Sequence, residues 1–305
     1  ILNDDLTSQE IDKLLGQGNK VAFSGIIRDV VLKDTPATIE REWLLEANYL
    51  FSLEESSTIN ITEKDLERIK YIASEDPLTQ LKDSFCVSIF GQEDVKKALI
   101  LQMVGGNTTS IEGESESKNR GTIHVLLIGE PSSGKSRLEN ATISLCPKAR
   151  GVSGEGSSGA GLTAAVVKDD FLGCWAVEAG AMVLANKSVA VIDEFDKVRD
   201  EDKQRLYYAM SDCKIKIDKA TIHTILSAET ALLCGANTKG RLELGNLAQS
   251  INMSPALLSR FDFIFLFEDK IDEQRDTKIA KAMMQARRGS EKIRPKIEPL
   301  LFKKY

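Results

Sequence analysis

A glycine-rich segment that contains one lysine carries the clearest chemical signal in the sequence. It matches the pattern G-x-x-x-x-G-K-[ST] in full and consists of Gly129, Glu130, Pro131, Ser132, Ser133, Gly134, Lys135 and Ser136. A β-branched apolar run at 122–128 precedes it and a helix-compatible run at 137–145 follows it, which is the order of a phosphate-binding loop. In such a loop the backbone N–H groups and the helix N-terminus face the phosphates, Lys135 reaches the β- and γ-phosphates, and Ser136 holds Mg²⁺. The sequence therefore predicts a nucleoside triphosphate site with Mg²⁺, and the flanks disfavour a glycine-rich turn with a chance lysine.

Two carboxylates end a second apolar run. Asp193 and Glu194 close the segment 189–194. Near a phosphate loop, Asp193 can hold Mg²⁺ through water and Glu194 can polarise the water that attacks the γ-phosphate. The alternative is that both acids cap the helix that begins near Asp200. The phosphate loop earlier in the chain favours the catalytic interpretation, and an Asp-Glu pair indicates hydrolysis more than a switch.

Two single residues give weaker signals. Asn237 ends the apolar run 232–236 and is expected to hydrogen-bond the γ-phosphate or the attacking water, although Asn-Thr-Lys-Gly is also an ordinary turn sequence. Arg260 follows a short predicted helix, and its planar charge suits an arginine finger that stabilises phosphoryl transfer. The alternative for Arg260 is a surface arginine paired with Asp262.

Alternating lysines and isoleucines at 213–225 predict a β-hairpin. The run reads Cys-Lys-Ile-Lys-Ile-Asp-Lys-Ala-Thr-Ile-His-Thr-Ile, which places polar and apolar side chains on opposite faces of a strand. Residues 218–221 can form the turn, with Lys219 at the tip. An ammonium on a flexible stem suits a backbone phosphate of nucleic acid, and three lysines are candidates for this contact: Lys214, Lys216 and Lys219. The alternative is a solvated hairpin with Lys219 paired to Asp218.

The composition indicates an intracellular protein without a zinc site. The chain has 305 residues, and its net charge of −6 means that any contact with nucleic acid must come from local basic elements. No apolar run approaches the length of a membrane span. The two histidines, His124 and His223, lie in apolar runs where a core or surface-strand role is expected. The five cysteines are dispersed without a C-x-x-C pair and are expected to be reduced: Cys86, Cys146, Cys174, Cys213 and Cys234.

Strands and helices that alternate from Gly121 onward predict an α/β sheet with crossover connections. The expected strands lie at 122–128, near 149–152, and at 189–193, 232–236 and 263–267, with strand-rich interruptions at about 157–178 and 213–225. Upstream, 1–52 has the alternation of β structure, and helices are expected from about 63 with Thr62 as N-cap, at 77–85 and at 91–103. A polar mobile loop is expected at 107–120 and a basic tail at 287–305.

Together these motifs resemble the AAA+ core of the minichromosome maintenance (MCM) replicative helicases. The resemblance rests on the phosphate loop, the block Asp-Glu-Phe-Asp-Lys at 193–197, the strand-end Asn237 and the block Leu-Leu-Ser-Arg-Phe-Asp at 257–262. Three further segments agree with it, at 88–97, 120–127 and 161–167. The match runs from about 45 to 285, and residues 1–52 resemble the end of the family's oligonucleotide-binding (OB) β-barrel domain.

The resemblance implies a P-loop AAA+ three-layer sandwich, with a helix-2 insertion at about 157–178 and a pre-sensor β-hairpin at about 213–225. The implied divisions are a partial OB-like β domain at 1–52, a linker with helices at 53–84, the ATPase core at 85–286, and a basic tail at 287–305 that starts a missing C-terminal lid.

The implied function is that of a DNA helicase that hydrolyses ATP with Mg²⁺ in a hexameric ring and acts in DNA replication. Ile89 and Phe90 would line the adenine pocket, Arg260 would act on the neighbouring subunit's ATP, and Lys219 resembles the family's pore lysine. The implied partners are single- and double-stranded DNA and the other subunits of a homo-hexamer or MCM-type ring. The implied location is the cytoplasm of an archaeon or the nucleus of a eukaryote.

The chain also departs from the family pattern. Gly134 stands where the family usually has Ala, and Thr238 replaces the Pro that usually follows the sensor Asn, which makes the placement of Asn237 less secure. The zinc-bearing part of the N-terminal domain and the lid with the second sensor arginine are absent, and the first residue is not Met, which suggests a fragment. The alternative function is therefore a nucleotide-binding ring or scaffold subunit with little or no hydrolysis.

Overall fold

The computed structural model describes residues 21–35, 38–52, 61–107, 109–110, 118–157, 159–168, 175–219, 222–238, 250–267 and 295–305, together with positions 277 and 284. Within this part of the chain no helix is long and apolar enough to cross a membrane.

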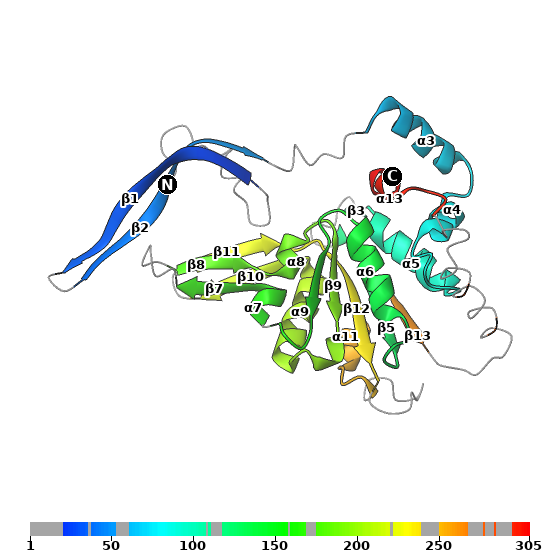
Figure 1. Cartoon of the computed structure of the whole chain (residues 1–305). Helices are drawn as coiled ribbons and strands as arrows, with labels where there is room; N and C mark the ends of the chain where they lie inside the picture. The colour runs from blue at the N-terminus through cyan, green and yellow to red at the C-terminus, as the bar shows by residue number, and fades with distance from the viewer. Residues whose placement is uncertain are drawn as a thin grey trace.

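A five-stranded parallel sheet forms the centre of the molecule (Figure 1). Its order is β13-β5-β12-β9-β6. Of these five strands β5 comes first in the sequence, and both of its neighbours, β12 and β13, come from much later in the chain. The strands are β5 (Val125–Gly129), β6 (Arg150–Ser153), β9 (Val189–Asp193), β12 (Ala231–Asn237) and β13 (Phe263–Phe267). The predicted α/β sheet is confirmed, although β5 begins three residues later than the apolar run suggests.

Helices cover both faces of this sheet because its strands are apolar on both sides. Alternate residues of β5 enter two different cores: Leu126 and Ile128 pack with α9 (Asp200–Asp212), whereas Val125 and Leu127 pack with α5 (Glu93–Val104) and α6 (Lys135–Leu145). The shorter helices α8 (Ala181–Leu184) and α11 (Pro255–Leu258) border the α9 side. The result is a three-layer arrangement.

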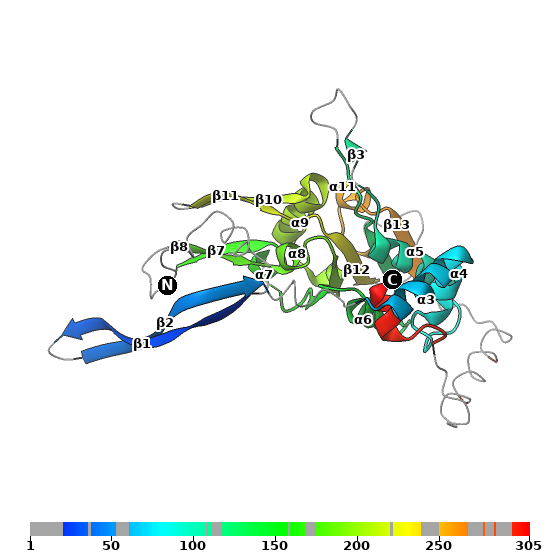
Figure 2. The same cartoon turned by 90° about the horizontal axis from the view of Figure 1, so that it is seen from above.

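Two hairpins interrupt the alternation of strands and helices and project beside each other from the sheet (Figure 2). The first follows the short helix α7 (Gly159–Leu162) and consists of β7 (Ala164–Lys168) and β8 (Trp175–Ala179). The second consists of β10 (Lys214–Lys219) and β11 (Ile222–Ser227). Both occupy the predicted strand-rich interruptions, although β8 ends one residue and β11 two residues beyond the predicted ranges. The polar segment predicted as a loop contains a short antiparallel ladder between β3 (Thr109–Ser110) and β4 (Lys118–Asn119).

The N-terminal described segment is a long antiparallel hairpin of β1 (Val21–Thr35) and β2 (Thr38–Ser52) (Figure 1). The register of this hairpin shifts between Ser24 and Gly25. Glycine is needed at this position because a Cβ would lie 2.1 Å from the backbone oxygen of Glu46. The assignment of this segment to an OB-type domain stays a prediction.

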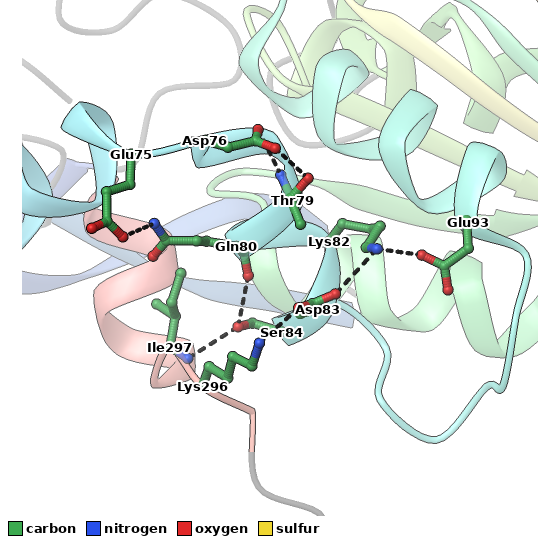
Figure 3. A network of polar contacts seen from close by, with 10 residues as sticks. All are labelled: Glu75, Asp76, Thr79, Gln80, Lys82, Asp83, Ser84, Glu93, Lys296 and Ile297. Carbon is green, nitrogen blue, oxygen red and sulfur yellow. Dashed lines mark hydrogen bonds and ion pairs between the residues drawn. The ribbon is translucent and has the colours of Figure 1, made fainter.

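The C-terminal segment packs on the helices that precede the sheet. Helix α3 (Glu63–Ser74) begins with the predicted capping box of Thr62 and Asp65, and α4 (Pro77–Ser84) follows. Figure 3 shows Lys296 and Ile297 reaching α4: Lys296 Nζ lies 2.8 Å from Asp83 Oδ2, and the Ile297 N–H donates to Ser84 Oγ at 3.0 Å. The last helix, α13 (Pro299–Lys304), contacts α3 and α6. Residues 295–305 are thus part of the packed domain, and the first eight residues of the predicted basic tail, 287–294, lie outside the described residues.

Candidate functional site

Three strand ends bring the predicted site residues to one edge of the sheet. β12 pairs in parallel with β5 on one side and with β9 on the other, and Asn237 lies opposite Gly129 in this register. Asp193 ends β9. Because all three strands run in the same direction, Gly129, Asn237 and Asp193 lie at the carboxyl edge, where open α/β sheets bind their ligands.

The phosphate loop leads from β5 into α6 through a left-handed residue. Gly134 has φ of +94° and is the N-cap of α6, and a Cβ there would lie 3.3 Å from Ile89 Cδ1. The α6 N-terminus therefore opens onto this loop with its N–H groups free of a side-chain cap, as an anion site requires. The predicted adenine-pocket residue Ile89 lies against the loop, while the neighbouring Phe90 is 49% exposed.

Lys135 is the best buried charge of the loop. Its side chain is 5% exposed, and its Nζ donates to the backbone oxygens of Gly129 at 3.0 Å and Glu130 at 2.8 Å and to Ser133 Oγ at 3.2 Å. Burial lowers the pKa of Lys135, with the acids behind it acting in the opposite direction. The ammonium is thus held inside the loop at the start of α6, which is the position that a lysine for the β- and γ-phosphates needs.

Ser136 and Asp193 meet as the predicted magnesium ligands. Ser136 Oγ donates to Asp193 Oδ2 at 2.9 Å, and Asp193 Oδ1 accepts from the Glu194 N–H at 2.7 Å. A hydroxyl and a carboxylate are hard oxygen donors, and Mg²⁺ is usually held by one or two such protein groups with phosphate and water filling the remaining positions. The two residues therefore fit Mg²⁺ bound with a nucleotide.

Glu194 stands just past the strand end in a left-handed conformation, with φ of 55°. Its Oε1 lies 2.8 Å from Lys197 Nζ, and its Oε2 accepts from Ser153 Oγ at 3.3 Å. The Lys197 ammonium lowers the pKa of Glu194. Glu194 is accordingly a carboxylate at neutral pH, which is the form that can accept a proton from water.

Asn237 is tied to the same carboxyl-rich segment. Its backbone N–H donates to Asp196 Oδ1 at 2.9 Å, and Asp196 belongs to the 3₁₀ turn η2 (Phe195–Lys197) that follows Glu194. This bond fixes the end of β12 beside the end of β9. The hydrogen bond of the Asn237 side chain to phosphate or water stays a prediction.

Arg260 is the one predicted catalytic residue that lies away from this edge. It precedes β13, whose Phe263 pairs with Val125 and whose Phe267 pairs with Gly129. Since β13 and β5 are parallel, Arg260 lies beyond the amino edge, more than about 13 Å along the strand direction from the loop. The alternative of an Arg260–Asp262 pair is wrong: Asp262 pairs with Arg120 at 2.9 Å, and Arg260 contacts Tyr207.

The lysines of the second hairpin lie as the alternation predicts. Lys214, Lys216 and Lys219 are exposed, whereas Ile215 and Ile217 are half-buried. The predicted turn of 218–221 begins two residues too early, because Asp218 pairs with His223 and Lys219 with Ile222, so that both belong to β10. The alternative ion pair is also wrong, since Asp218 Oδ1 contacts His223 Nδ1 at 2.7 Å. A cavity of about 690 Å³ lies between β10 and the first hairpin.

A buried acid behind the magnesium ligands escapes prediction from the sequence. Glu139 on α6 is 2% exposed, and its Oε1 has no hydrogen-bond partner among the described residues. Burial, and secondly the neighbouring Asp193, raise the pKa of Glu139 to about 8. Room for the carboxyl group comes from Gly235 on β12, where a Cβ would lie 2.0 Å from Glu139 Oε1. An acidic residue one helical turn after Ser136 was the available signal.

Comparison with known proteins agrees with this geometry. The family model described as the MCM P-loop domain matches residues 65–287. The chain is 35% identical over 301 residues to DNA replication licensing factor mcm7 of Xenopus tropicalis, covering 96% of this chain and 41% of that protein. It is 35% identical over 298 residues to DNA replication licensing factor MCM7 of Arabidopsis thaliana, covering 95% and 41%. DNA replication licensing factor Mcm5 of Drosophila melanogaster is 39% identical over 254 residues, covering 81% and 34%.

The chain thus spans between about one third and two fifths of the length of these relatives. The family model covers the phosphate loop, the Asp-Glu pair, Asn237 and Arg260 in one continuous match. The central parallel sheet of the chain and its turn from the phosphate loop into α6 are those of a P-loop domain. The chain belongs to the MCM family.

Proposed function

We propose that this chain is the ATPase part of an MCM-type helicase subunit, which hydrolyses ATP at the contact between neighbouring subunits of a ring and moves DNA in replication. The observation that carries the proposal is the separation of two half-sites on one sheet. The carboxyl edge holds Lys135, Ser136, Asp193 and Glu194, and Arg260 lies beyond the amino edge. A finger at that distance can act only on a nucleotide bound by another copy or by a related subunit.

Each residue then has a distinct task in hydrolysis. The loop amides and Lys135 bind the phosphates, and Ser136 with Asp193 would hold Mg²⁺, which would supply positive charge for the phosphate oxygens. Glu194 takes the proton of the attacking water, and Asn237 orients that water or the γ-phosphate. Arg260 of the neighbouring subunit stabilises the transition state. Asp193, Glu194 and Asn237 act from fixed strand ends, which preorganises the site.

Two substitutions test the assignments within the site. Lys135→Ala is expected to abolish ATP binding, because the loop amides alone do not balance the phosphate charge. Glu194→Gln is expected to bind ATP normally and to stop turnover, since an amide accepts no proton from water. Binding is measured with a fluorescent ATP analogue and turnover by phosphate release, with and without DNA. Parental turnover by Glu194→Gln in an assembled ring would show that the catalytic assignment is wrong.

The relatives support the proposed ring and its proposed location. They bear the names of different licensing factors, mcm7, MCM3 and Mcm5, and come from eukaryotes, which supports a place among non-identical subunits in the nucleus over a homo-hexamer in an archaeal cytoplasm. A mass measurement of the isolated chain tests this point: a stable homo-hexamer contradicts it. The scaffold alternative predicts ATP-dependent assembly without phosphate release.

A further inference from the structure

The guanidinium group of Arg260 is held by a tyrosine. Arg260 Nη2 donates to the Tyr207 hydroxyl at 2.9 Å, and Arg260 Cζ lies 4.8 Å from the centre of the Tyr207 ring. A cation over an aromatic face is attracted to the ring, and the hydrogen bond sets its orientation. Tyr207 itself is fixed, because it lies on α9 and packs against the core beneath that helix.

The backbone of the same turn is anchored separately. Arg120 Nη2 donates to the Arg260 backbone oxygen at 3.0 Å and to Asp262 Oδ1 at 2.9 Å. The second oxygen of Asp262 accepts from the His124 N–H at 2.8 Å. These bonds place the Cα of Arg260 relative to β5 and leave the direction of its side chain to Tyr207. The Arg260 Nε is buried without a hydrogen-bond partner among the described residues.

We propose that Tyr207 is a positioning residue for ATP hydrolysis, which aims Arg260 at the nucleotide of the neighbouring subunit. The proposal rests on the proposed function of Arg260. A free arginine side chain samples many rotamers and must lose this freedom whenever it engages the transition state. Stacking on Tyr207 removes that freedom in advance, so the interaction is preorganised for the step in which charge develops. Tyr207 touches no substrate in this scheme and acts through Arg260.

Three variants separate this role from simple packing. Tyr207→Phe keeps the ring and its core contacts and removes the hydroxyl. Tyr207→Ala removes both. Tyr208→Ala is the matched control, since Tyr208 is the next residue of α9, is 63% exposed and contacts Tyr207 edge-on at 5.6 Å between ring centres. The melting temperature of each variant reports packing, and the kinetic constants report positioning.

In the assembled ring, Tyr207→Ala is expected to lower kcat for ATP hydrolysis about tenfold. The KM for ATP is expected to stay within a factor of about two, because the subunit that carries Tyr207 binds its nucleotide at the opposite edge of the sheet. Tyr207→Phe is expected to lower kcat about threefold at an unchanged melting temperature, and Tyr208→Ala to retain the parental kcat. In an Arg260→Ala background, Tyr207→Ala is expected to add nothing. A further loss in that background, or a parental kcat for Tyr207→Ala, would overturn the proposal. A parental kcat for Arg260→Ala would instead overturn the proposed function of the finger.

A chemical test needs neither a ring nor turnover. Phenylglyoxal modifies free arginine side chains, and mass spectrometry of the peptide that contains Arg260 gives the rate at this position. The expected result is several-fold faster modification in Tyr207→Ala than in the parent or in Tyr208→Ala, with the rates at other arginines unchanged. Equal rates of Arg260 modification in the parent and in Tyr207→Ala would show that the tyrosine side chain does not hold the guanidinium. This result would overturn the proposal even if the chain alone hydrolyses no ATP.

Discussion

Gly235 and Glu139 are expected to be energetically coupled across the sheet. Gly235 lies in the buried strand β12, and a Cβ there would lie 2.0 Å from Glu139 Oε1, 3.1 Å from Glu139 Cδ and 3.4 Å from Asp193 Oδ1. Glu139 is too well buried to swing into solvent. Gly235→Ala therefore forces the carboxyl group into closely packed neighbours, and such overpacking costs about 1–3 kcal/mol.

The same substitution should be harmless once the carboxyl group is gone. Glu139→Ala empties the space that the new methyl group needs, and Ala in a strand interior is favoured over Gly by about 0.5–1 kcal/mol. In the Glu139→Ala background, Gly235→Ala is thus expected to be neutral or slightly stabilising. The effect of Gly235→Ala on the free energy of unfolding should therefore differ between the parent and Glu139→Ala by about 2 kcal/mol, which is the coupling free energy. The shift in melting temperature caused by Gly235→Ala should correspondingly differ by about 4–8 °C.

Thermal unfolding of four proteins, followed by circular dichroism at pH 7, measures this coupling: the parent, each single variant and the double variant. Gly156→Ala serves as the control, because a Cβ at Gly156 meets nothing within 4 Å. The control should change the free energy of unfolding by less than about 0.5 kcal/mol. If Gly235→Ala costs the same with and without Glu139, to within about 0.5 kcal/mol, the two residues do not compete for this space and the steric argument is wrong.

Three further predictions concern acid stability, DNA binding and helix capping. Burial lowers the pKa of His124 from 6.5 to about 4, so His124 contributes stability above pH 6.5 that is lost as the pH falls towards 4. His124→Asn should reduce this loss, which thermal unfolding at several pH values between 4 and 7 measures. Lys219→Ala should weaken DNA binding by the assembled ring and lower its salt dependence while ATP binding stays normal; affinity titrations at two salt concentrations decide this, and an unchanged salt slope would exclude the contact. Thr62→Ala removes the N-cap of α3 and should lower the free energy of unfolding by about 1 kcal/mol, as measured by chemical denaturation. Ser74→Ala, at the exposed last position of the same helix, is the control and should leave this free energy unchanged.

The parts of the fold that the sequence predicts well are those set by local chemistry. The phosphate loop, the capping box at Thr62 and the strands ending in Asp193 and Asn237 depend on glycine conformation, side-chain caps and short apolar runs, all of which are visible within about ten residues. The local pattern starts the hairpin turn two residues too early because Asp is a common turn residue. In the structure Asp218 has a cross-strand partner, His223, which keeps it in the strand.

The contacts that the sequence does not predict join residues far apart in the chain. Glu139 meets Gly235 only because β12 is inserted between β5 and β9, an order that no local pattern encodes. Tyr207 looks like an ordinary aromatic residue of a helix until α9 is placed beside the turn that carries Arg260, 53 residues later. In both cases a substitution at one position is interpretable only with the other in view.

One continuous segment joins the hairpin that carries the lysines to the end of the sheet that carries the nucleotide residues. Only residues 228–230 separate β11 from β12, and they are firmly held: the Ala228 N–H donates to the Cys213 oxygen at 2.9 Å, and Thr230 Oγ1 donates to the Met182 oxygen at 2.6 Å. Both side chains are buried. Because this connection is short and held by these hydrogen bonds, we expect the base of the hairpin to follow any displacement of β12 that the proposed contact of Asn237 with phosphate produces. We therefore expect the short buried connection to couple the proposed nucleotide site to the hairpin that carries Lys219.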